Sequence, residues 1–110
     1  MPWTIETALD DPDLTVISRD SDRDQFNVRI GKLKTIVTIS LQRSARSDQT
    51  GFKVSHAMKT PEQLDPYWTG VPHGDYPAYA LRKAITGLTD YYRQGVKAGH
   101  EPREDWLVPG

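Results

Sequence analysis

The feature of this sequence that most constrains its fold is a change of hydrophobic period. Apolar and polar residues alternate from Phe26 to Leu41 and again from Phe52 to Met58. Successive side chains of a strand point to opposite faces, so this alternation predicts half-buried antiparallel strands. From about residue 76 to 98, apolar residues recur instead at every third or fourth position, which predicts one long helix. This apolar stripe consists of Ala78, Leu81, Ile85, Leu88, Tyr92 and Val96.

A turn signal divides the first alternating region. Gly31 and Lys32 separate residues 26–30 from residues 33–41. A two-residue turn with glycine in first place is typical of a type II′ hairpin, in which that residue needs a positive φ. We therefore predict a tight hairpin there. The β-branched run at 14–18 predicts a further strand before it.

Two stretches lack either period. Residues 43–50 are polar and predict a long loop leading into the next strand, at 52–58. Residues 60–77 contain four prolines together with several aromatic residues, so we expect ordered, irregular chain there. The tail at 106–108 reads Trp-Leu-Val and is too apolar to stay in solvent, so we expect it to dock.

The order of elements predicts one α+β domain spanning residues 1–110. Four strands form an antiparallel meander, and the long C-terminal helix packs on one face of it to give two layers. Asp75 is the expected N-cap of that helix, with Pro77 in its first turn and Gly99 at its C-terminal end. Residues 3–10 predict either a short helix capped by Thr4 or a short strand.

Composition excludes several classes of protein. The chain has no Cys, which excludes disulfides and thiol nucleophiles. No apolar run approaches the roughly 18 residues of a membrane span, and the N-terminus has no signal-peptide pattern. We therefore expect a cytoplasmic protein that does not enter membranes. Leu, Ile, Val and Phe together supply 23 of 110 residues, which indicates a thin core that a partner subunit would help to complete.

The sequence offers no recognisable catalytic set. The three His, at 56, 73 and 100, are too far apart along the chain for a local metal motif, so we expect no metal and no cofactor. Ser55 precedes His56, but neighbours on a strand point to opposite faces and are not expected to form a nucleophile–base pair. We therefore expect no catalytic residue and no enzymatic activity.

Charge is uneven along the chain. Residues 25–59 carry seven bases and one acid, whereas both flanks are acidic. The strand face opposite the helix displays part of this charge, so it is a candidate nucleic-acid surface as well as a candidate solvated face. Its basic residues, with those of the adjoining loop, are Arg29, Lys34, Arg43, Arg46 and Lys53. The face lacks the aromatic residues on which single-stranded bases usually stack.

Two further groups are candidate contact surfaces. The proline-rich connection presents a candidate ligand or partner loop made of Tyr67, Trp68, His73, Asp75 and Tyr76. Small residues beside the helical stripe leave room either for the protein's own sheet or for a second copy. The candidate dimer contacts are Gly87, Tyr91, Gly95 and Trp106.

The sequence therefore favours a small, non-enzymatic cytoplasmic binding or regulatory module that acts as a homodimer. One alternative is a nucleic-acid-binding protein that uses the basic sheet face. Another is a small ligand-binding protein or enzyme centred on residues 67–79.

Overall fold

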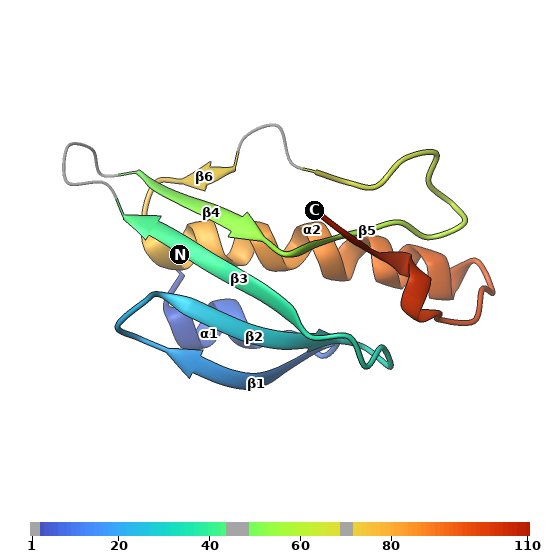
Figure 1. The fold of residues 1–110 in the computed structure, drawn as a ribbon, viewed down its shortest axis with the longest axis horizontal. Coiled ribbons are helices and arrows are strands. Elements are labelled where there is room, and N and C mark those ends of the chain that lie inside the picture. Colours follow the sequence, from blue (N-terminus) through green and yellow to red (C-terminus); the bar gives the residue numbers. More distant parts are fainter. Residues whose placement is uncertain (1–2, 44–48, 69–71) are drawn as a thin grey trace.

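A computed structural model describes residues 3–43, 49–68 and 72–110 (Figure 1). A five-stranded antiparallel sheet has the order β1-β2-β3-β4-β6, and β5 and β7 form a separate two-stranded sheet. The elements in chain order are α1 (Ile5–Leu9), β1 (Leu14–Asp20), β2 (Gln25–Ile30), β3 (Val37–Arg43), β4 (Thr50–Val54), β5 (His56–Met58), β6 (His73–Gly74), α2 (Pro77–Lys97), a 3₁₀ turn (Glu104–Trp106) and β7 (Leu107–Pro109).

The predicted α+β class with one long C-terminal helix is confirmed. Helix α2 runs behind the five-stranded sheet in Figure 1, and the short α1 lies on the same side. The alternating residues of the central strands are buried toward α2, as their pattern predicts: Phe26, Val28, Ile30, Val37, Ile39, Leu41 and Phe52. The helical stripe is buried from Ala78 to Tyr92, whereas Val96 is 43% exposed. At that last turn, Thr60 and Trp106 cover the side of α2 that carries Gly95 instead.

The predicted turn at Gly31-Lys32 is present and is closed by a bond from the Leu33 N–H to the Ile30 carbonyl (2.9 Å), but the two-residue hairpin predicted around it is wrong. Strand β3 begins only at Val37, which pairs with Val28, so residues 31–36 form a longer connection. Its backbone N–H groups bond to distant parts of the chain: that of Gly31 to the Asp13 carbonyl (2.7 Å) and that of Lys32 to the Tyr92 hydroxyl (3.0 Å). Gly31 does have the expected positive φ, +52°, and the Tyr92 ring occupies the space that a side chain there would need.

The strand predicted over residues 52–58 is two strands. Strand β4 ends at Val54, and β5 leaves the main sheet to pair with β7. Ser55 stands at the break, where its N–H donates to the Thr38 carbonyl (2.9 Å) and its carbonyl accepts from the Gly110 N–H (3.0 Å). The docked tail therefore provides β7, and β5 leaves the five-stranded sheet to pair with it.

The connection after β5 is irregular, as expected, except for the two residues of β6. These pair with Thr50 and Gly51 and add a fifth strand to the predicted four. The conformation of residues 44–48 lies outside the described residues, so the central part of the predicted loop at 43–50 does too.

The helix ends follow local rules with one exception. Of the two alternatives for residues 3–10, the helix is the one observed, at residues 5–9. The Thr4 hydroxyl caps it by accepting from the Thr7 N–H (3.1 Å). Tyr76, not Asp75, occupies the N-cap position of α2, so that prediction is wrong. A proline forces the preceding residue into extended backbone, and Tyr76, directly before Pro77, has φ −152° and ψ 163°. Gly99 follows the helix with φ +94°, as predicted.

One buried carboxylate joins the N-terminal segment to α2. The Asp11 side chain is fully buried and accepts bonds from both Arg93 Nη atoms (3.0 and 3.1 Å). It also accepts from Arg82 Nη1 (3.3 Å) and the Thr89 hydroxyl (3.1 Å). Over the described residues, no helix has the length and apolar character needed to cross a bilayer.

Candidate functional site

The connection between β5 and β6 is held in place by bonds of its own. The Gln63 side chain accepts from the Thr60 N–H (2.8 Å) and donates to the Met58 carbonyl (3.0 Å). The Tyr67 N–H donates to the same carbonyl (3.1 Å). These bonds tie the proline-rich chain to β5 and set the positions of Tyr67 and the following Trp68.

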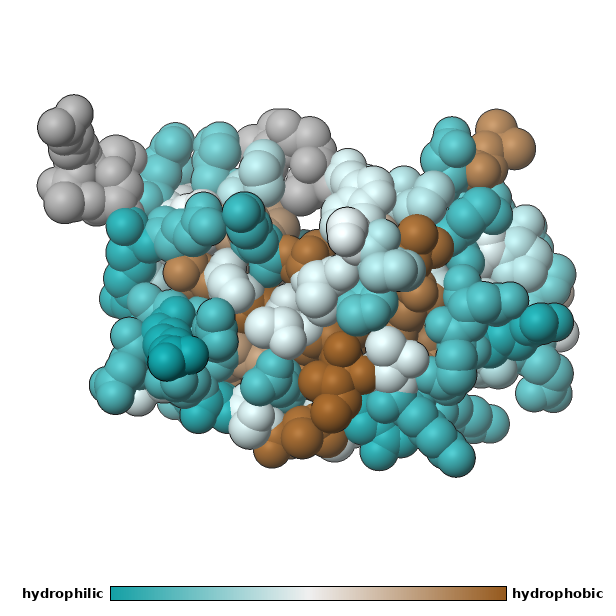
Figure 2. Space-filling model, viewed as in Figure 1, coloured by the Kyte–Doolittle hydropathy of each residue, from teal (hydrophilic) through white to brown (hydrophobic). Residues whose placement is uncertain are grey.

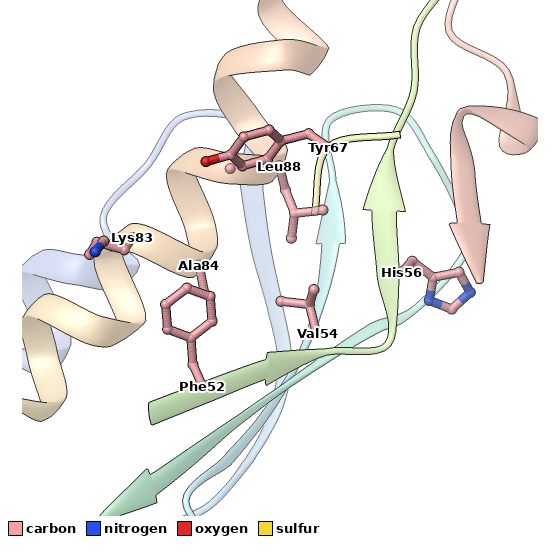
Figure 3. Close-up of a pocket in the computed structure, with 8 residues that line it drawn as sticks. Phe52, Val54, His56, Tyr67, Lys83, Ala84 and Leu88 are labelled. Atoms are coloured by element: carbon pink, nitrogen blue, oxygen red, sulfur yellow. The ribbon is translucent and has the colours of Figure 1, made fainter. Parts of the chain in front are cut away.

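Tyr67 packs across α2. Its ring lies 4.8 Å from that of Tyr91, centroid to centroid, and directly over Gly87, where an added Cβ would be 3.1 Å from the Tyr67 ring. Figure 3 shows Phe52 and Val54 of β4 facing Ala84 and Leu88 of α2, with Tyr67 above Leu88. Tyr67 thus covers the small hollow between the sheet edge and the helix.

An apolar groove lies beside Trp68. The groove has a volume of about 300 Å³ and is lined by Phe52, Lys53, Val54, Trp68 and Pro72. A bond from the Phe52 N–H to the Pro72 carbonyl (2.9 Å) fixes one wall to the other. Trp68 is 45% exposed, and Lys53 is exposed on the outer side of β4. We call this cavity the Trp68 groove: its walls are apolar and its one lining charge is positive.

A second, more polar cavity of about 250 Å³ lies along α2 and is bordered by Tyr67. It is lined by Tyr67, Lys83, Thr86, Gly87, Asp90, Tyr91 and Gln94. Its lining combines the charged side chains of Lys83 and Asp90 with the Tyr67 ring, so its character differs from that of the apolar Trp68 groove.

The predicted ligand loop is divided between different tasks. Tyr67 and Trp68 line the cavities just described. His73 pairs with Gly51 through its backbone, and its carbonyl accepts from Lys83 Nζ (2.9 Å). The Tyr76 hydroxyl accepts from the Trp3 N–H (2.7 Å), while Asp75 is exposed. Of this group, the structure therefore brings only Trp68 to the Trp68 groove, while Tyr67 borders the cavities along α2.

The predicted basic residues that the structure describes have different partners. Arg43 makes a two-bond ion pair with Asp24 (2.8 and 3.0 Å), and these bonds raise the pKa of the Arg43 guanidinium above its usual value. Arg29 donates from Nε to the Leu33 carbonyl (3.1 Å), and the Lys34 N–H donates to the Glu104 carboxylate (2.9 Å). Lys53 lines the Trp68 groove.

Arg46, the remaining member of that set, lies outside the described residues. Nucleic-acid binding stays a prediction, and a salt-dependent mobility-shift assay tests it.

The predicted dimer contacts are covered by the protein's own chain. Tyr67 lies over Gly87 and stacks on Tyr91. Thr60 and Trp106 lie over Gly95, where an added Cβ would be 2.9 Å from Thr60. Trp106 is only 3% exposed. The protein's own chain explains the small residues of α2, so they give no separate reason for a second copy at this face.

Ser55 and His56 are in contact, contrary to the sequence prediction. Ser55 Oγ lies 2.7 Å from His56 Nδ1, because the strand break at Ser55 removes the alternation that would separate the two side chains. The same Oγ accepts from the Thr38 N–H (2.8 Å). This bond ties Ser55 to β3 and supports a structural part for its hydroxyl at the break.

Among residues 3–43, 49–68 and 72–110, no three His, Asp or Glu side chains gather into a group that would hold a metal ion. A scan against protein-family models matches no family, and searches of curated proteins and of solved structures find no match.

The feature that sequence reasoning missed is Leu64. It is 95% exposed, which is the largest exposure among the large apolar residues described. Figure 2 shows an apolar projection among polar surface at the end of the molecule where Figure 1 places the connection between β5 and β6, to which Leu64 belongs. No periodic signal marks it, because it lies in irregular chain between prolines.

Proposed function

We propose that this chain is a non-enzymatic binding module of the cytoplasm. In this proposal the Trp68 groove receives an apolar side chain flanked by carboxylates on a protein partner. The observation that carries the proposal is the groove itself, with apolar walls, a half-exposed Trp68 and Lys53 beside it.

The chemistry of the groove supports this class of partner. Exposed aromatic side chains that border a pocket are the usual anchors of protein interfaces. The groove volume, about 300 Å³, is at the lower end of the range for small-molecule sites, so it suits one anchoring side chain better than a larger ligand. A cation at the edge of an apolar pocket favours carboxylates next to the anchor, because complementary charge at a rim contributes specificity.

The test uses two fluorescent peptides and polarisation. Each has one leucine in a Gly-Ser background, flanked in one peptide by two aspartates and in the other by two lysines. We expect the aspartate peptide to bind more tightly by about tenfold, which corresponds to roughly 1.4 kcal/mol. Trp68→Ala should weaken its binding, and Lys53→Glu should reverse the preference.

Lys97→Glu is the matched control, because Lys97 is exposed at the far end of α2. It changes the net charge as Lys53→Glu does and should leave the preference unchanged. Equal binding of both peptides, or binding that Trp68→Ala does not weaken, contradicts the proposal.

A further inference from the structure

We propose that the partner is a second copy of this chain, and that Leu64 of each copy fills the Trp68 groove of the other. This inference rests on the proposed function, since it uses the same groove. It replaces the dimer surface predicted from the helix, which the protein's own chain covers.

Leu64 projects into solvent from a restrained segment of backbone. It is 95% exposed, yet its neighbour Gln63 is fixed by bonds to the Thr60 N–H (2.8 Å) and the Met58 carbonyl (3.0 Å). Pro66 follows two residues later and restricts the chain further. An apolar side chain presented on restrained backbone loses little conformational freedom on binding, which favours its use as an anchor.

The charges beside the projection and the groove are opposite. Asp65 follows Leu64 directly and is exposed, and Lys53 lines the groove. Neither forms an ion pair within the part of the chain that the structure describes. The other acid of this segment, Glu62, already contacts His100 Nε2 at 3.0 Å. A copy that inserts Leu64 would therefore bring the Asp65 carboxylate to the partner copy's Lys53 ammonium.

The proposed contact is a two-fold one. Leu64 and the groove wall Trp68 belong to the same connection and are four residues apart. In an isologous pair each copy then gives one projection and receives one, and the contact occurs twice. The half-exposed Tyr67, between them in sequence, would lie in the same interface.

The test is the mass of the full chain in solution, by light scattering from about 1 to about 100 µM, the range expected of a small reciprocal interface. We expect a dimer. Leu64→Asp should weaken it by more than about tenfold, because it places a charge in an apolar groove. Ile36→Asp is the matched control: Ile36 is also exposed, at 48%, and precedes β3. That variant should remain dimeric.

Charge reversal identifies the contact. Asp65→Lys and Lys53→Glu should each weaken the dimer by about tenfold, since the symmetry applies each change twice. An equimolar mixture of the two variants should dimerise again, because both contacts of the mixed pair become attractive. All substituted residues are exposed, and far-UV circular dichroism of each variant verifies the fold.

A wild-type chain that stays monomeric over this range overturns the inference, and so does a dimer that neither Leu64→Asp nor the charge reversals weaken. In the Leu64→Asp variant no second copy is expected to fill the Trp68 groove. Peptide binding to this variant therefore tests the proposed function separately from the proposed dimer. Peptide binding with a monomeric wild type leaves the proposed function standing alone.

Discussion

Asp11 allows a quantitative test of how the N-terminal segment is held. Its carboxylate is fully buried and accepts from Arg93, Arg82 and Thr89 of α2, and Oδ1 also accepts from the Asp13 N–H (2.9 Å). Removing one member of a buried ion pair costs about 3–5 kcal/mol when the remaining charge stays buried. Here the cost is smaller, because the Arg93 and Arg82 side chains are 38% and 21% exposed.

The partners of Asp11 also keep other bonds. Arg93 still contacts Asp13 (3.0 Å), and the Thr89 hydroxyl can donate to the Ile85 carbonyl (3.2 Å). We therefore expect Asp11→Ala to lower the free energy of unfolding by about 2–3 kcal/mol, and the melting temperature by roughly 10–20 °C.

The assay is urea unfolding, followed by circular dichroism and tryptophan fluorescence, at neutral pH. Asp10→Ala is the matched control, because Asp10 is exposed and the substitution removes the same charge. Its effect on the free energy of unfolding should stay within about 0.5 kcal/mol. A loss below about 1 kcal/mol for Asp11→Ala, or one equal to that of the control, would refute the assignment of Asp11 as the tie between α1 and α2.

The parts of the fold that the sequence predicts are those that local periodicity determines. Alternation from Phe26 to Leu41 assigns the correct residues to the buried face, because each side chain's direction depends only on its strand position. The helical stripe identifies α2 to within a residue at its start, and Gly99 marks its end. Each of these signals lies inside the element that it predicts.

The errors occur where the chain bonds to distant residues. After the turn at Gly31-Lys32 the chain does not enter β3 directly, because Glu104 bonds to the N–H groups of Lys34 and Thr35. Tyr92 and Asp13 bond to N–H groups of the turn itself. The strand break at Ser55 depends on β7, about fifty residues later in the chain. The local sequence at residues 31–36 and at Ser55 gives no sign of these distant partners. Alternation alone therefore predicts continuous strands there.

The Trp68 groove was accessible to sequence reasoning only in part. The aromatics of the proline-rich stretch marked Trp68 as a candidate, and Trp68 lines the groove. Phe52 and Val54 carry the pattern of core residues, and they line the groove because β4 lies near the sheet edge and β6 pairs with only two of its residues. Which side of a strand stays uncovered is a property of the whole topology, so the groove could not be assembled from motifs.

Three further substitutions test other contacts. Val37→Asp, at a fully buried position of β3, should unfold the domain, because an unpaired buried charge costs several kcal/mol; Ser40→Asp, on the other face, should leave it folded in thermal melts. Gly95→Leu should push away Trp106, destabilise by about 1–3 kcal/mol and red-shift the tryptophan emission, whereas the exposed neighbour Ala98→Leu should do neither. Glu104→Gln should lower the stability of the fold at neutral pH but not at strongly acidic pH. The Lys34 N–H, with the N–H and hydroxyl of Thr35, lowers the pKa of Glu104, so the ionised carboxylate stabilises the folded state above its unfolded pKa. That contribution is lost as the pH falls through the lowered folded value. The difference in urea midpoint between wild type and Glu104→Gln should therefore be present at pH 7, decrease as the pH falls below the unfolded Glu pKa of about 4.3, and vanish only below the lowered folded pKa, and Glu101→Gln should show no such difference. A difference that persists unchanged at low pH would mean that the Glu104 charge does not hold the 31–36 connection.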